Sequence, residues 1–161
     1  MMKMKNLLLI LLLGATPGMS GDDNGIIGEL TENGVSVIYN FVNELPGKSI
    51  LEEFPILVVV KWEYDGSDYN GMPNKSIQEK LYQLDDELDE IAELGAGYRA
   101  YSRTGNNIRE YAYYTVDKPI YMHLLNEQLK DKPTYPIEIT FYEDPEWSDF
   151  KKIMEIFNDD K

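Results

Sequence analysis

The sequence predicts an α+β domain: a ferredoxin-like β-α-β-β-α-β antiparallel sheet with one extra N-terminal strand and a C-terminal helix. Three observations support this fold class. Segments of alternating apolar residues and segments of helical periodicity follow one another in the order that this core requires. Gly105-Asn106-Asn107 separates two tyrosine-rich strand candidates, which is typical of a β-hairpin. The chain has 161 residues, a length that suits one domain.

Each element is indicated by its own periodicity and end signals. Strands are expected at 34–45, 55–64, 98–104, 108–116 and 134–142. Helices are expected at 75–94, at 118–129 and after Asp144-Pro145. The strand at 55–64 is a continuous run of apolar, largely β-branched residues, which indicates a central position beside the strand at 108–116. Pro136 places the strand at 134–142 at an edge, because proline cannot donate a hydrogen bond to a neighbouring strand. The strand at 34–45 should extend one edge of the sheet.

The helices carry recognisable start signals. Ser76 and Glu79 have the spacing of a capping box at the start of the first long helix. In the last helix, Asp144 suits a cap, Pro145 suits the first helical position, and Trp147 falls on the inward face. A metal-binding or catalytic role for Asp144 is the alternative. The two longer helices should pack on one face of the sheet, because both of their crossovers are right-handed.

The composition excludes several classes of function. The chain has no cysteine, so disulfides, thiolate metal sites, cysteine nucleophiles and a lipoprotein anchor are ruled out. It has 15 Lys and Arg residues against 29 Asp and Glu residues, a formal net charge of −14. Nucleic-acid affinity comes mostly from basic side chains that neutralise phosphates, so we expect no nucleic-acid partner. No nucleotide-binding motif is present, and we expect neither a cofactor nor a metal.

The first residues have the layout of a secretory signal peptide. Two lysines precede a Leu/Ile run at 7–13, and small residues follow at Gly18 and Ser20. That run is much shorter than the roughly 20 residues that a membrane-spanning helix needs. We therefore expect an exported protein, periplasmic or extracellular, with no integral membrane segment after cleavage. The predicted division is a signal peptide at 1–20, a flexible spacer at 21–33 and a single α+β domain at 34–161.

All three arginines of the chain lie in the predicted hairpin, among several tyrosines. Guanidinium groups bind carboxylates, and tyrosines supply flat contact area, so this hairpin is a candidate binding site with arginines as anion anchors and tyrosines as walls. The candidate residues are Arg103, Thr104, Arg109, Glu110, Tyr111 and Tyr113. The alternative is that the arginines pair with internal acids such as Glu110 and Glu63. Arg103 and Arg109 share a sheet face only if the loop between the strands has an odd number of residues.

Short motifs spread over most of the chain carry a resemblance to a known family. They are Trp62-Glu63-Tyr64, Gly71-Met72-Pro73, Leu84-Asp85-Asp86, Ile108-Arg109-Glu110-Tyr111, Tyr113-Tyr114-Thr115, Tyr135-Pro136-Ile137 and Asp144-Pro145-Glu146-Trp147. Together they resemble the bacterial family catalogued as domain of unknown function 695, which is distantly similar to the regulator of ribonuclease E activity B. The resemblance implies a ferredoxin-like fold and a binding role. An exported protein would not meet ribonuclease E, so it does not imply that partner.

These observations favour a non-catalytic domain that binds a protein or peptide through its open sheet and hairpin face. The partner should be another envelope or extracellular protein or peptide. Two alternatives stay open: a small hydrolase with Glu110, Glu143 or Asp144 as general acid or base, and a structural envelope protein. A cleft that joins Arg109 to Glu143 or Asp144 would favour the hydrolase.

Overall fold

The computed structural model describes residues 25–158 of the chain. Its strands are β1 (Gly25–Glu32), β2 (Val35–Val42), β3 (Ile56–Glu63), β4 (Tyr98–Gly105), β5 (Ile108–Thr115) and β6 (Ile137–Glu143). Its helices are α1 (Lys48–Glu53), α2 (Lys75–Ile91), α3 (Lys118–Leu129) and α4 (Ser148–Asn158), with short helical segments η1 (Ser67–Tyr69) and η2 (Ala92–Ala96). The predicted signal peptide at 1–20 lies outside the described residues. No helix within 25–158 is long and apolar enough to cross a membrane.

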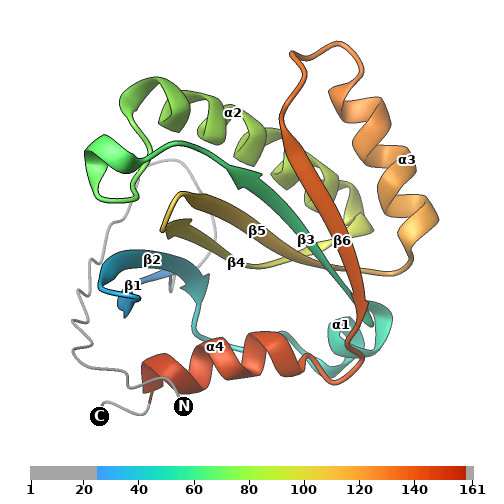
Figure 1. Ribbon diagram of the computed structural model, residues 1–161. Helices are drawn as coiled ribbons and strands as arrows, with labels where there is room; N and C mark the ends of the chain where they lie inside the picture. The colour runs from blue at the N-terminus through green and yellow to red at the C-terminus, as the bar shows by residue number, and fades with distance from the viewer. Residues whose placement is uncertain (1–24, 159–161) are drawn as a thin grey trace.

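The strands form one six-stranded antiparallel sheet in the order β1-β2-β4-β5-β3-β6 (Figure 1). β3 and β5 lie next to each other in its interior, and β6 forms one edge, as the sequence predicts. β2 extends the sheet beyond β4, which confirms the expected additional strand. The predicted α+β class is therefore correct, and the sheet is one strand larger than expected.

That further strand is β1, which the sequence pattern does not indicate. The sequence predicts a flexible spacer at 21–33, but Gly25–Glu32 pairs with β2 along its whole length. The alternation of β1 is hard to recognise because one of its inward positions is Gly28. A Cβ added to Gly28 would lie 2.2 Å from the ring of Phe157, so glycine is required here to let α4 pack closely. The first part of the predicted spacer, 21–24, lies outside the described residues.

Helices cover both faces of the sheet. In Figure 1, α2 and α3 lie over one face, and α1 and α4 lie over the other. On the α2 side, Leu84 and Leu88 pack in one cluster with Val58, Tyr113 and Tyr121, which confirms the predicted inward face of the two longer helices. On the α4 side, a second cluster is built from β1, β2, β3, β4, β5 and α4. The β1–β2 end of the sheet extends past the part that α2 covers, and this leaves room for a cleft.

The hairpin between β4 and β5 has a two-residue turn. Asn106 and Asn107 both have positive φ, 53° and 64°, which is the backbone of a type I′ turn and suits asparagine. Gly105 pairs with Ile108 in the ladder. An even loop places Arg103 and Arg109 on opposite faces of the sheet, so the two do not share a face.

Two helix starts differ in detail from the predictions. Asn74, and not the pair Ser76 and Glu79, caps α2: its Oδ1 accepts a hydrogen bond from the backbone N–H of Ile77 at 2.9 Å. The true cap lies two residues earlier, directly after Pro73. The sequence does not predict the short helix α1, because six residues are too few to establish a helical period.

Asp144 holds the start of α4, as the cap interpretation predicts. Its carboxylate accepts hydrogen bonds from the backbone N–H groups of Ser148 at 2.8 Å and Asp149 at 3.0 Å. The hydroxyl of Tyr114 donates a third, at 2.7 Å. Pro145 is not the first helical residue, however, because a turn that ends at Trp147, with φ of 55°, comes between Asp144 and the helix.

This cap should make stability depend on pH. Burial alone would raise the pKa of Asp144, but the hydrogen bonds from Asp149, Tyr114 and Ser148 outweigh it and lower the pKa. A carboxylate with a lowered pKa stabilises the fold above its unfolded pKa of about 4, and this contribution is lost as pH falls through the folded pKa. Asp144→Ala should therefore lower the free energy of unfolding by about 0.5–2 kcal/mol at pH 7, and by less at acidic pH. Urea titrations at several pH values measure this loss, with the exposed Asp86→Ala as the control. A loss in the free energy of unfolding that did not change with pH would contradict the prediction.

Candidate functional site

A cleft of about 410 Å³ opens on the α2 side of the sheet. One wall is α2, and the other is the extension of the sheet through β4, β2 and β1. Apolar side chains that include Ile27, Ile38 and Leu81 line its sides, and Ser102 and Arg109 lie among its polar residues. The cleft therefore combines apolar walls with a few convergent polar groups, the usual composition of a ligand site.

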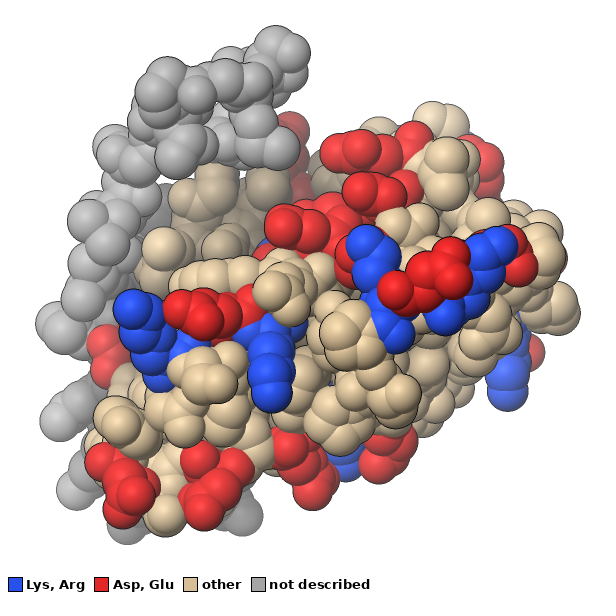
Figure 2. Space-filling model, turned by 90° about the horizontal axis from the view of Figure 1, so that it is seen from above, with Lys and Arg blue, Asp and Glu red and all other residues tan. Residues whose placement is uncertain are grey.

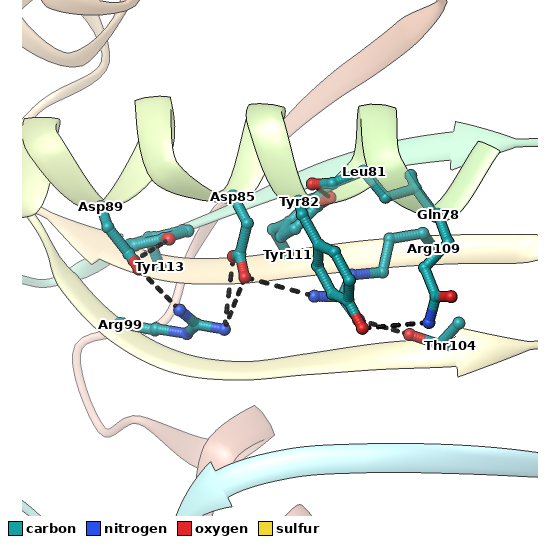
Figure 3. Close-up of polar contacts among 10 residues, drawn as sticks. All are labelled: Gln78, Leu81, Tyr82, Asp85, Asp89, Arg99, Thr104, Arg109, Tyr111 and Tyr113. Carbon is teal, nitrogen blue, oxygen red and sulfur yellow. Dashed lines mark hydrogen bonds and ion pairs between the residues drawn. The ribbon is translucent and has the colours of Figure 1, made fainter. Parts of the chain in front are cut away.

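Arg109 is held in place on β5. Its guanidinium lies over the ring of Tyr111, with the central carbon 4.6 Å from the ring centroid, and its Nη1 donates a hydrogen bond to Thr104 Oγ1 (Figure 3). Its Nη2 lies 3.6 Å from Asp85 Oδ2 on α2, an ion pair that is longer than a hydrogen bond. The Arg109 side chain is only 12% exposed. It is positioned by stacking and by one hydrogen bond, and most of its five N–H donors are not engaged by these contacts.

Asp85 is shared between two arginines. Arg99 on β4 lies 3.3 Å from Asp85 Oδ1 and 2.8 Å from Asp89 Oδ2, while Arg109 approaches Asp85 from the other side (Figure 3). The hydroxyl of Tyr113 donates to Asp89 at 2.6 Å. Burial raises the pKa of Asp85, and the two arginines partly counteract this effect. Two guanidinium groups thus face two carboxylates, and the charges within the cluster balance.

Several polar atoms around the cleft lack partners. Within residues 25–158, four buried side-chain atoms make no hydrogen bond, and three of them belong to residues that line the cleft: Asp85 Oδ1, Ser102 Oγ and Arg109 Nε. Ser102 is only 1% exposed. A buried polar group without a partner costs about 1–3 kcal/mol, and such groups are rare in native proteins. Three of these four atoms belong to residues of one cleft, and this makes the cleft the candidate site.

The predicted binding residues divide between the two faces of the sheet. Thr104 and Arg109 line the α2-side cleft. Tyr111 and Tyr113 lie behind it at 1% exposure each, so they are core residues and not walls of an open site. Tyr111 donates to the carbonyl oxygen of Leu81 at 2.6 Å. The prediction of an open hairpin face is wrong at this point, because α2 covers the two tyrosines.

Arg103 and Glu110 lie on the opposite face, next to each other in the ladder. Arg103 forms an ion pair with Glu32 at the end of β1 and is 9% exposed. The hydroxyl of Tyr39 also contacts Glu32, at 3.2 Å. Internal pairing, the alternative interpretation of the arginines, therefore describes Arg103, as it describes Arg99 and, through the longer contact with Asp85, Arg109. The partner of Arg103 cannot be named from the sequence, because the pattern of β1 does not indicate a strand.

A second cleft, of about 450 Å³, lies on the α4 side. It brings together Glu110, Glu143 and Asp144, the acids of the hydrolase alternative, but Arg109 is not among its lining residues. Burial raises the pKa of Glu110, with Arg103 and then Lys61 lowering it. Asp144 is engaged as the α4 cap. Within the described part of the chain, no cluster of three or more His, Cys, Asp or Glu side chains could hold a metal ion.

Two residues of the α2-side cleft are missed by reasoning from the sequence. Asp85 is one of several acids on α2, and most of these are expected to face water. It lies four residues after Leu81 and next to Leu84, at the border of the buried stripe, and this position is the available signal. Ser102 sits on β4, two residues from Thr104, and therefore faces the same side of the sheet. Only its orphaned hydroxyl distinguishes it from an ordinary strand serine.

Comparison with known proteins places the chain in a family. No curated protein and no solved structure matches it significantly. A family model described as "Family of unknown function (DUF695)" matches residues 28–154. This match runs from within β1 into α4, and it includes the other five strands, α2 and every lining residue of the two clefts except Ile27. The chain therefore belongs to DUF695, a family whose function is unknown.

Proposed function

We propose that the protein is a non-catalytic binding domain for a protein or peptide, and that part of this ligand occupies the cleft between α2 and the β1–β2–β4 extension of the sheet. The observation that carries the proposal is the set of unpartnered buried polar atoms around an apolar-walled cleft of about 410 Å³. A volume of this order accommodates one or two side chains or a small molecule.

The rim of the cleft supports a peptide or protein ligand. Ile27, Ile38 and Tyr82 are exposed by 36%, 37% and 54%, and they converge on this cleft from β1, β2 and α2. Scattered exposed apolar residues are ordinary, but their convergence around a polar floor is typical of an interaction site. A ligand chain could lay apolar groups on this rim while one polar group enters the cleft.

The expected location of the partner follows from the sequence. A signal-peptide-like start supports an exported protein, so the proposed partner is another envelope or extracellular protein or peptide. A balanced cluster of charges around the cleft, in a chain of net charge −14, does not favour nucleic acid.

A matched pair of arginine variants tests the proposal. Peptides are selected from a displayed random library against the intact domain, and their dissociation constants are measured for the wild type, Arg109→Ala and Arg103→Ala. Arg109→Ala should weaken binding by about 30-fold or more, equivalent to about 2 kcal/mol, as arginines at the centre of interfaces do. Arg103→Ala should leave binding unchanged, because Arg103 lies on the other face.

Circular dichroism melts establish that both variants are folded. The proposal would be overturned if no peptide were enriched, or if the enriched peptides bound Arg109→Ala as tightly as the wild type. Equal losses in both arginine variants would also count against the cleft, since Arg103 does not line it.

A further inference from the structure

We infer that the ligand group that enters this cleft is an amide, a neutral group with one carbonyl acceptor and at least one N–H donor. This inference rests on the proposed function, because it names the chemistry of the group that the same site recognises. It follows from the hydrogen-bonding capacity that the described residues leave unused around the cleft and from the balance of charge there.

Two of the unpartnered atoms call for an acceptor. Arg109 Nε carries an N–H that makes no hydrogen bond within residues 25–158, and the hydroxyl of Ser102 is free to donate. They come from adjacent, paired strands, β5 and β4. A carbonyl oxygen has two lone pairs and can accept from two such donors at once.

The third unpartnered atom calls for a donor. Asp85 Oδ1 lies 3.3 Å from Arg99 Nη2 but makes no hydrogen bond within the described residues. Asp85 lines the cleft from α2, opposite the strands that carry Ser102 and Arg109. An amide N–H is the complementary group, and an amide places it next to the carbonyl that the other two atoms require. A ketone or an ester would leave Asp85 Oδ1 unsatisfied.

The charge around the cleft argues against a carboxylate. Arg109 is not a free cation, because Asp85 lies beside it and Asp89 compensates Arg99. Seen from above in Figure 2, acidic and basic side chains lie interspersed on the part of the surface that is drawn in colour. To enter the cleft, a ligand carboxylate would have to lose its hydration shell, and it would then lie next to the like charge of Asp85. It also carries no hydrogen-bond donor for the Asp85 carboxylate. A neutral amide avoids both penalties.

Access to the floor requires movement of the rim. In Figure 3 the ring of Tyr82 lies in front of the Arg109 guanidinium, and Gln78 Nε2 donates to the Tyr82 hydroxyl at 3.0 Å. Both side chains project from the exposed side of α2 and line the cleft. Exposed side chains change rotamer within picoseconds to nanoseconds, so this pair can admit a ligand group without a change in the fold.

Small probes of matched shape test the inference directly. The intact ¹⁵N-labelled domain is titrated with isobutyramide, N-methylpropionamide, isobutyrate and methyl isopropyl ketone, and the Arg109 Nε–H and backbone resonances are followed. We expect saturable shifts at Ser102, Thr104 and Arg109 for an amide, with an apparent affinity at least tenfold higher than for isobutyrate or the ketone. Preference for isobutyramide would indicate an Asn or Gln side chain, and preference for N-methylpropionamide a main-chain amide.

Two serine variants distinguish binding in the α2-side cleft from binding elsewhere on the surface. Ser102→Ala should reduce amide affinity about tenfold or more, because it removes one donor with almost no change in volume. Ser148→Ala, in the α4-side cleft, should have no effect. Asp85→Asn should raise the affinity for isobutyrate relative to isobutyramide, because it removes the like charge. Thermal unfolding curves show whether each variant is folded. If Asp85→Asn does not fold, the titrations of the wild type with the four probes decide whether the cleft prefers an amide to a carboxylate.

Three other outcomes of the probe titrations would each overturn the inference, and they can be told apart. If isobutyrate binds as tightly as the amides, the site recognises anions; if the ketone does, Asp85 does not select for a donor. In both cases the proposed peptide-binding function stands. If no probe shifts the cleft resonances, the amide inference is wrong, and the separate peptide selection still decides whether the cleft binds a ligand at all.

Discussion

Replacing Trp147 with alanine should lower the free energy of unfolding by about 3–5 kcal/mol, the usual range for a buried tryptophan. Trp147 is 0% exposed and stacks on Tyr114, with ring centroids 3.8 Å apart and planes inclined by 7°. Its indole N–H donates to the carbonyl oxygen of Phe54 at 3.0 Å, which ties the start of α4 to the end of α1. The variant therefore loses a large packed ring and leaves a buried carbonyl without its donor. Guanidinium titrations monitored by circular dichroism measure the effect.

Two further variants separate the causes of this loss. Trp147→Phe keeps an aromatic ring but cannot donate to Phe54, so it should be less destabilising than Trp147→Ala. Tyr142→Ala changes an aromatic residue that is 53% exposed and should stay within about 0.5 kcal/mol of the wild type. A cost below about 1 kcal/mol for Trp147→Ala would contradict the described packing of α4.

Leu84→Ala should cost about 2–5 kcal/mol. Leu84 is 0% exposed and lies within the cluster between α2 and the sheet, so the lost methyl groups would leave a cavity beneath the helix. Gln83→Ala, one residue earlier on the exposed side of the same helix, is the matched control and should change stability by less than about 0.5 kcal/mol. Similar small effects for both variants would show that the inward face of α2 is assigned wrongly.

Local patterns are sufficient to predict most of the architecture. The helical spacing of Leu84 and Leu88 identifies the buried stripe of α2, and the proline at 136 identifies an edge strand. These signals are local because backbone periodicity and side-chain alternation are properties of a few consecutive residues. The same reasoning fails for β1, where glycine occupies an inward position and the apolar alternation is interrupted.

Local sequence patterns do not predict which side chains meet at the candidate site. The confinement of the arginines to one hairpin is visible in the sequence, but the face of each one is not. The two-residue turn at Asn106-Asn107 sends Arg103 to Glu32 and Arg109 to the α2-side cleft. Tyr111 and Tyr113 have the pattern of an exposed aromatic surface, and only the position of α2 shows that they are buried.

The sequence by itself determined the class of the fold and most of its elements, and it singled out the hairpin that contributes Thr104 and Arg109 to the α2-side cleft. Only the tertiary structure decided which side chains meet there. Asp85 and Arg109 are 24 residues apart in the chain and come together because α2 crosses over β5. Contacts of this kind depend on how whole elements pack, and no pattern within a single element records them. The unsatisfied Ser102 hydroxyl is likewise a property of the packed molecule, since every serine in an unfolded chain can hydrogen-bond to water.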